Sequence, residues 1–313
     1  MADLLAVLRE HSRALLIAPP GAGKTTKVAP ALLSETWCTG QVLLLVPRRL
    51  AARAAAEFMA AALGEKTGET IGYATRLDSK QSKDTRLLVM TPGLFRNRIL
   101  ADPELTGVTA VLFDEVHERS LDGDFALALA IDAQQGLRDD LRLVAMSATL
   151  DGARFGALLG NAPVVKSEGK IWPLDLRHIG RRTEDRLEVS VLAAVRKALA
   201  DEPEGDMLTF LPGAGDIERA ATAVEEARLP LVVHRLHGQI DPALQRAALV
   251  RDANGKRKLI LATSIAETSL TIEGVRIVID AGLSRRPRFD KAAGIARLVT
   301  ERASPASATQ RAG

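Results

Sequence analysis

Residues 14–26 read "ALLIAPPGAGKTT", and this stretch decides the fold because an apolar run passes directly into a glycine-rich loop. The run Leu15-Leu16-Ile17 has no polar alternation, which is typical of a strand buried on both faces of a parallel sheet. The residues that follow the glycines are compatible with a helix. The stretch therefore predicts a strand, a tight loop and a helix in succession.

The loop fits the pattern G-x-x-x-x-G-K-[ST], in which a glycine-rich turn wraps around phosphate oxygens. Gly23, Lys24 and Thr25 match its last three positions, and Ala18 stands at the first, where a strand-like conformation tolerates it. The ammonium of Lys24 suits the β- and γ-phosphates of a nucleotide, and the Thr25 hydroxyl suits Mg²⁺. The nucleotide-binding residues expected here are Gly21, Ala22, Gly23, Lys24, Thr25 and Thr26.

Outward from this loop, short apolar runs alternate with alanine-rich, helix-compatible stretches such as 49–63 and 188–200. This alternation predicts an α/β protein with mainly parallel sheets and right-handed crossovers. A polar break at residues 167–186 predicts a boundary between two domains. The runs that predict strands are residues 14–20, 41–47, 86–92, 110–115, 142–149, 206–212, 231–238, 258–264 and 275–282.

A second stretch, "VLFDEVHERS" at residues 111–120, places several ionisable groups directly after one of these runs. A carboxylate at the carboxyl end of a parallel strand points toward the place where α/β sheets bind ligands. Asp114 is therefore expected to hold Mg²⁺, and Glu115 to orient or deprotonate the attacking water. Two adjacent carboxylates are costly in a buried site, and a divalent cation would offset that cost.

The composition is that of a globular protein: 313 residues, 47% hydrophobic, with no apolar run long enough to cross a membrane. Cys38 is the single cysteine, and the N-terminus has no secretory pattern, so a reducing cytoplasm is expected. Residues 284–313 hold seven Arg or Lys against Asp290 and Glu301. A basic segment of this kind suits either a polyanionic partner or a solvated edge.

Several blocks together resemble the DEAH/RHA group of superfamily 2 helicases, most closely its bacterial HrpB-type branch. Residues 114–117, Asp-Glu-Val-His, correspond to the DEAH box. The other blocks occur in the family's order, spread over residues 18–313. They are "PRRLAARAAA" (47–56), "TPGLFRN" (91–97), "SAT" (147–149), "FLPGAGDIE" (210–218), "ATSIAETSLTIEG" (262–274) and "QRAG" (310–313), which resemble motifs Ia, Ib, III, IV, V and the start of VI.

The resemblance implies two tandem RecA-like domains, residues 1–170 with motifs I to III and residues 171–313 with motifs IV, V and the start of VI. It implies an ATP-dependent RNA helicase that binds ATP and Mg²⁺, hydrolyses NTP and moves along single-stranded RNA. Asp114, Glu115, His117, Lys24 and Gln310 would be catalytic, with Thr25 and Asp114 at the metal. Ser147 and Thr149 would couple hydrolysis to movement, and Arg48, Arg49, Thr91, Gly213 and Thr263 would contact the nucleic-acid backbone.

Two positions depart from the family pattern. Ser264 replaces the usual Asn of motif V, and Phe58 stands where the family has a base-stacking arginine. The chain also stops at Gly313, inside motif VI, so we expect a fragment whose second domain is incomplete and whose hydrolysis is impaired. The alternatives that the residues leave open are a DNA-directed translocase and a nucleotide-switched RNA clamp, with a small-molecule kinase further away.

Overall fold

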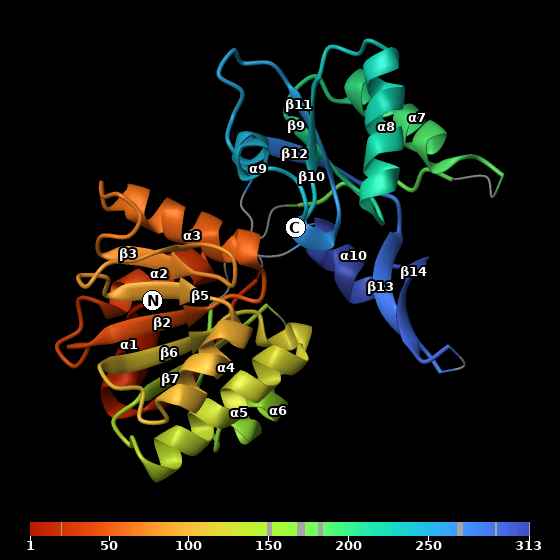
Figure 1. The fold of residues 1–313 in the computed structure, drawn as a ribbon. Helices are drawn as coiled ribbons and strands as arrows, with labels where there is room; N and C mark the ends of the chain where they lie inside the picture. Colours follow the sequence, from red (N-terminus) through yellow and green to blue (C-terminus); the bar gives the residue numbers. More distant parts are fainter. Residues whose placement is uncertain are drawn as a thin grey trace. The chain divides into compact units, whose positions relative to one another are not determined.

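A computed structural model describes residues 1–19, 21–148, 152–167, 173–180, 184–267, 272–291 and 293–312. The chain forms two compact units, Met1–Trp172 and Pro173–Gly313. Each unit has its own mainly parallel sheet with helices packed against it (Figure 1). The prediction of an α/β protein with mainly parallel sheets is confirmed.

The first unit has an eight-stranded sheet in the order β4-β3-β5-β2-β6-β7-β1-β8. Its described pairings are parallel except for β3 with β4, the short antiparallel strand at the edge. The strands are β1 (Arg13–Ile17), β2 (Gln41–Leu45), β3 (Ile71–Ala74), β4 (Ser79–Lys80), β5 (Leu87–Met90), β6 (Val108–Phe113), β7 (Arg142–Ser147) and β8 (Val164–Lys166).

Helices cover both faces of this sheet, with α2 and α3 on one side and α4 and α5 on the other (Figure 1). Consecutive strand residues such as Leu43 and Leu44 are therefore both buried, which explains the continuous apolar runs. The helical elements are α1 (Ala2–Glu10), α2 (Lys24–Leu32), α3 (Arg49–Ala62), α4 (Pro92–Ala101), the 3₁₀ turn η1 (Val116–Glu118), α5 (Leu121–Gly136) and α6 (Gly152–Leu158).

The second unit has a four-stranded parallel sheet in the order β10-β11-β9-β12. Helices α7 and α8 pack against it through a cluster of buried residues that includes Val195, Ile217 and Leu261. The elements of this sheet layer are α7 (Leu187–Asp201), β9 (Asp206–Phe210), α8 (Ala214–Glu226), β10 (Val232–Leu236), α9 (Pro242–Leu249), β11 (Lys258–Ala262), the 3₁₀ turn η2 (Ser264–Ala266) and β12 (Val275–Asp280).

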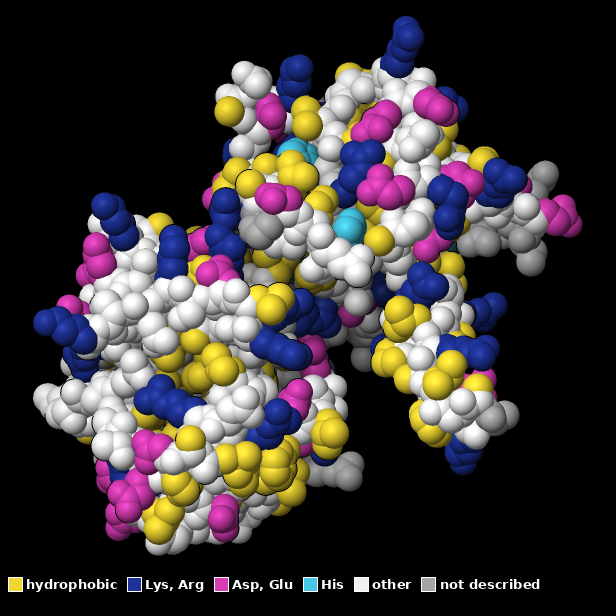
Figure 2. All heavy atoms as spheres, in the orientation of Figure 1, with side chains coloured by type: hydrophobic (Ala, Val, Ile, Leu, Met, Phe, Trp, Pro, Cys, Tyr) yellow, Lys and Arg dark blue, Asp and Glu magenta, His cyan; other side chains and the backbone are white. Residues whose placement is uncertain are grey.

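The last part of the second unit is an antiparallel hairpin, β13 (Leu283–Asp290) with β14 (Ile295–Arg302), followed by α10 (Pro305–Ala312). Asp290 pairs with Ile295 at the end of the hairpin where the two strands are connected. The exposed apolar residues of the hairpin include Phe289 and Leu298. Figure 2 shows hydrophobic and basic side chains together on this part of the surface. The basic segment of the sequence therefore lies largely on exposed strands of the second unit.

Candidate active site

The candidate active site lies in the first unit, where three neighbouring strands end. β1 pairs with β7 in a register that places Ile17 beside Ser147, and β7 pairs with β6. Beyond β1, the amide of Ala18 donates a hydrogen bond to the carbonyl oxygen of Ser147 (3.1 Å). The glycine loop after β1 and the carboxylates after β6 therefore converge at the carboxyl edge of the sheet.

The glycine loop has the backbone conformation that its sequence predicts. Gly21 and Gly23 have φ angles of 74° and 76°, in the left-handed region that residues other than glycine rarely adopt. Gly23 is the N-cap of α2, so the amides of the first helical turn point toward the loop. Ala18 extends the ladder between β1 and β7, which explains why a glycine is not needed there. Pro20 is outside the described residues.

Lys24 is 6% exposed, and its side chain folds back onto the backbone of the loop. Its Nζ donates hydrogen bonds to the carbonyl oxygens of Ala18 (2.9 Å) and Pro19 (3.2 Å). A phosphate group would offer this ammonium stronger, charged acceptors than the two carbonyl oxygens. The buried ammonium and the N-terminus of α2 together fit an anionic ligand.

The Thr25 hydroxyl donates a hydrogen bond to Asp114 Oδ2 at 2.5 Å. The two residues are far apart in sequence, so the strand order brings them together. Burial raises the pKa of Asp114 to about 7, and the neighbouring Glu115 carboxylate acts in the same direction, while Thr25 and Lys24 oppose the shift. A buried hydroxyl and carboxylate in contact, next to an ammonium, form a donor set suited to Mg²⁺ with nucleotide phosphates.

Among the described residues, no group of three or more His, Cys, Asp or Glu side chains could hold a metal by itself. Mg²⁺ commonly binds through one or two protein ligands, with waters and substrate phosphates completing its shell. Thr25 and Asp114 fit that mode. The Mg²⁺ and nucleotide expectations remain proposals, and the donor geometry supports them.

Glu115 is 9% exposed and has a left-handed φ of 52°. This conformation turns the chain sharply out of β6 into η1, so Glu115 lies at the start of the turn. The backbone amide of Ala148 donates to His117 Nδ1 (3.3 Å), and burial lowers the pKa of His117. His117 is therefore neutral at physiological pH with Nδ1 as an acceptor, and it joins the turn to the end of β7.

The remaining predicted positions lie at strand ends in both units. In the first unit, Arg48 and Arg49 follow β2, and Thr91 follows β5 as the N-cap of α4. In the second unit, Gly213 is the N-cap of α8 after β9, and Thr263 follows β11. Strand ends are where ligand-binding residues of such sheets occur, but the roles of these residues stay predictions.

Ser147 is buried at the end of β7, whereas Thr149 lies outside the described residues. Gln310 is half-buried on α10, in the second unit. Phe58 is 57% exposed on α3, as a base-stacking side chain would need to be. The roles of these residues stay predictions.

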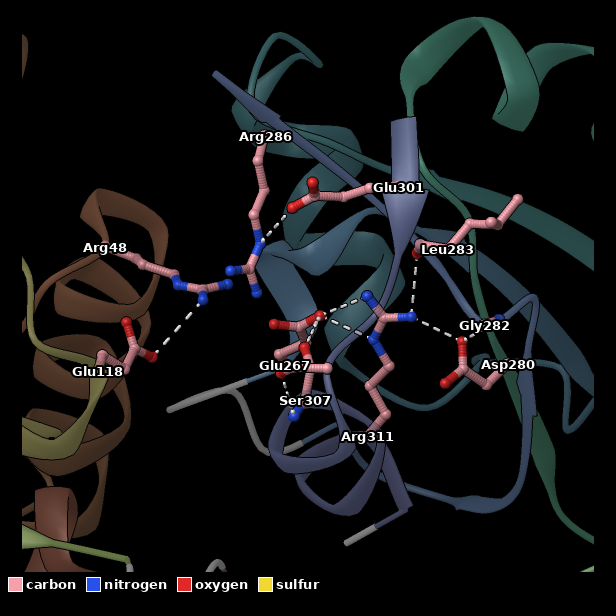
Figure 3. A network of polar contacts seen from close by, with 11 residues as sticks. Arg48, Glu118, Glu267, Asp280, Gly282, Leu283, Arg286, Glu301, Ser307 and Arg311 are labelled. Atoms are coloured by element: carbon pink, nitrogen blue, oxygen red, sulfur yellow. Dashed lines mark hydrogen bonds and ion pairs between the residues drawn. The ribbon is translucent and has the colours of Figure 1, made fainter. Parts of the chain in front are cut away.

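The sequence did not indicate how Arg311 is used. Its side chain is 1% exposed and pairs with Glu267 and with Asp280, each at 2.6 Å (Figure 3). It also donates to the carbonyl oxygen of Leu283 and lies over the ring of Phe210. Arg311 therefore joins α10 to the end of β12 and to the motif V segment within the second unit.

Two family models match the chain: DEAD/DEAH box helicase over residues 2–155 and helicase conserved C-terminal domain over residues 190–313. Together they span most of the sequence, and the chain belongs to the DEAD/DEAH box helicases. The predicted membership of the DEAH/RHA type is confirmed by the relatives below.

The chain is 46% identical to the ATP-dependent RNA helicase HrpB of Escherichia coli over 312 residues, which is 99% of this chain and 38% of HrpB. It is 33% identical to the probable ATP-dependent RNA helicase DHR2 of Saccharomyces cerevisiae over 324 residues, covering 99% of this chain and 44% of that protein. The chain thus spans less than half the length of these curated relatives.

A crystal structure of the Escherichia coli DEAH/RHA helicase HrpB superposes with a TM-score of 0.92 at 46% identity, over 100% of this chain and 40% of that one. A second, of the E. coli DExH-box NTPase HrpB, gives a TM-score of 0.82 at 45% identity, over 99% and 38%. These matches agree with two RecA-like folds. In the part of the chain that the structure describes, no helix has the length and apolar character needed to cross a membrane.

Replacing Lys24 by alanine is expected to weaken ATP binding by about 10- to 100-fold, because hydrogen bonds to charged groups contribute roughly 1.5–3 kcal/mol. Binding can be measured by titration with a fluorescent ATP analogue. Lys27→Ala is the matched control, since Lys27 is an exposed lysine one turn further along the same helix. Equal losses in the two variants would show that Lys24 does not contact the phosphates.

Proposed function

We propose that this protein is an ATP-dependent RNA helicase, which hydrolyses NTP to move along single-stranded RNA and separate strands. The observation that carries the proposal is the contact between the Thr25 hydroxyl and Asp114 Oδ2, with the Lys24 ammonium and Glu115 beside it. This grouping matches the parts that position a nucleotide and its metal in P-loop NTPases.

In the proposed mechanism, Gly21, Gly23 and the first turn of α2 bind the phosphates through backbone amides. Lys24 exchanges its two carbonyl partners for phosphate oxygens, and Thr25 and Asp114 hold the metal. The metal held by Thr25 and Asp114 would supply positive charge that stabilises the negative charge of the phosphates. Glu115 orients the attacking water and accepts its proton.

His117 and Ser147 lie beside these groups and would transmit the state of the nucleotide site to the rest of the protein. His117 already contacts the backbone of Ala148, immediately after Ser147. In this proposal Thr149 shares that coupling role, and Gln310 contributes to catalysis from the second unit. Both assignments come from the family resemblance.

We assign the two units to the two proposed RecA-like domains, residues 1–170 and 171–313. Arg48, Arg49 and Thr91 in the first domain, and Gly213 and Thr263 in the second, would bind the sugar–phosphate backbone, which suits a sequence-neutral motor. Cys38 is buried with a free thiol, which supports a reducing, cytoplasmic location.

The test is an assay of the intact protein for ATP turnover with and without single-stranded RNA, followed by strand separation on tailed RNA and DNA duplexes. RNA-stimulated turnover with RNA unwinding supports the proposal. Preferential action on DNA would indicate a DNA-directed translocase instead. RNA binding that depends on ATP but separates no strands would indicate a nucleotide-switched clamp. Absence of NTP hydrolysis would contradict all of these motor functions.

A further inference from the structure

Arg48, the N-cap of α3 in the segment after β2, has a charged partner within the first unit. Its Nη2 lies 3.5 Å from Oε1 of Glu118, the last residue of η1 (Figure 3). The two side chains are 24% and 19% exposed, so the pair stands at the surface but is partly shielded from solvent. Arg48 is one of the proposed nucleic-acid contacts, whereas the proposed function gives Glu118 no role.

The contact between the two side chains is an ion pair at 3.5 Å and not a hydrogen bond. Glu118 Oε1 is buried as an atom and makes no hydrogen bond in the described part of the chain. A phosphate offers an arginine two charged oxygens in a geometry that allows paired hydrogen bonds. A phosphate arriving at Arg48 would therefore replace a weak partner by a stronger one.

The turn that carries Glu118 touches the candidate active site. The amide of Glu118 donates to the carbonyl oxygen of Glu115 (2.9 Å), and Glu118 is one of the charges that act on the pKa of His117. The turn is bracketed by Glu115 and Arg119, whose φ angles of 52° and 51° are both left-handed. Non-glycine residues in this region are strained, and such strain is common at segments that change conformation.

We propose that Glu118 is a positioning residue that holds Arg48 when nucleic acid is absent and releases it to a backbone phosphate when a strand binds. The exchange frees the Glu118 side chain at the end of the turn that begins with Glu115. Binding of a strand is thereby linked to the residue that activates water, within one unit. This inference rests on the proposed function, because it requires that Arg48 contacts a nucleic-acid strand.

The test is a double-mutant cycle in the intact protein, with affinity for a fluorescently labelled single-stranded RNA as the readout. Glu118→Gln should raise the affinity about two- to fivefold, since partly exposed ion pairs contribute up to about that factor. Arg48→Gln should lower it. In the Arg48→Gln background, Glu118→Gln should change the affinity no more than Glu57→Gln does, because the competition for Arg48 no longer exists.

The matched control is Glu57→Gln. Glu57 forms an ion pair of 2.9 Å with Arg53 on the same helix that Arg48 caps, so its loss changes the net charge equally. Its effect on RNA affinity measures the general consequence of removing one negative charge. The thermal unfolding temperatures of all variants show whether each remains folded.

Three results would overturn the inference while leaving the proposed function intact: no effect of Glu118→Gln beyond that of Glu57→Gln, an equal effect in the Arg48→Gln background, or unchanged RNA affinity in Arg48→Gln. If the unmodified protein binds no RNA and its ATP turnover does not respond to RNA, the proposed function itself fails. The two kinds of failure are therefore distinguished by the unmodified protein.

Discussion

Glu115→Gln is expected to reduce RNA-stimulated ATP turnover by about 10²- to 10⁴-fold, the range that general-base groups contribute. The amide keeps the size of the side chain but cannot accept a proton from water. The new amide would also bring hydrogen-bond donors close to His117, whose Nδ1 lies 3.4 Å from Oε2 of Glu115. ATP affinity should change little, because Lys24, Thr25 and Asp114 remain. Steady-state turnover and nucleotide titration measure the two effects separately.

Glu10→Gln is the control for this substitution, since Glu10 is an exposed glutamate at the end of α1. It should leave turnover unchanged. If Glu115→Gln hydrolysed ATP as fast as Glu10→Gln, the water-activating role of Glu115 would be wrong. If ATP binding were lost as well, Glu115 would instead be needed to shape the phosphate site.

Arg311→Met is expected to lower the free energy of unfolding of the second unit by about 3–5 kcal/mol, because breaking a buried ion pair leaves an uncompensated charge. Two carboxylates would lose the arginine with which they form ion pairs, Glu267 at 9% and Asp280 at 24% side-chain exposure. Urea unfolding followed by amide hydrogen exchange in α10 and β12 measures the change in this unit. Arg311→Lys should lower the free energy of unfolding by less, since lysine keeps the positive charge but lacks the planar guanidinium group.

Arg288→Met is the matched control, because Arg288 is an exposed arginine of the same unit that pairs with Glu301 at 2.7 Å. Its removal should have a much smaller effect, since exposed ion pairs contribute little to stability. Equal losses in Arg311→Met and Arg288→Met would show that the buried pairs do not stabilise the unit.

Seven of the nine predicted strands are central in their sheets, where burial on both faces gives a continuous apolar run, whereas β10 and β12 are edge strands. All nine apolar runs contain a strand in the structure, from β1 to β12. The strands that were not predicted are short or lie at the edges. β3 has four residues that include Gly72, β4 has two exposed residues, and β8 is partly exposed. Tertiary pairing rather than local pattern forms these strands.

The core of the candidate site was also predictable, since a glycine loop after one strand and carboxylates after another must meet at the carboxyl edge of a parallel sheet. The contact between Thr25 and Asp114 agrees with that expectation. The partners of individual arginines were not predictable. Nothing in the pattern "QRAG" indicates that Arg311 is buried against Glu267. Likewise, nothing in the residues around Arg48 indicates that it pairs with Glu118. Such pairings depend on three-dimensional placement.

Lys24 Nζ already donates to the carbonyl oxygens of Ala18 and Pro19, so binding of the proposed nucleotide would exchange these partners for phosphate oxygens. A ligand without phosphate has no charged acceptor to replace these carbonyl oxygens, and a monophosphate provides fewer charged oxygens than a triphosphate. The loop should therefore sort nucleotides by the number of phosphates they carry before any contact with the base. An ADP left after hydrolysis would compete with the loop's own carbonyls for Lys24, which favours its departure.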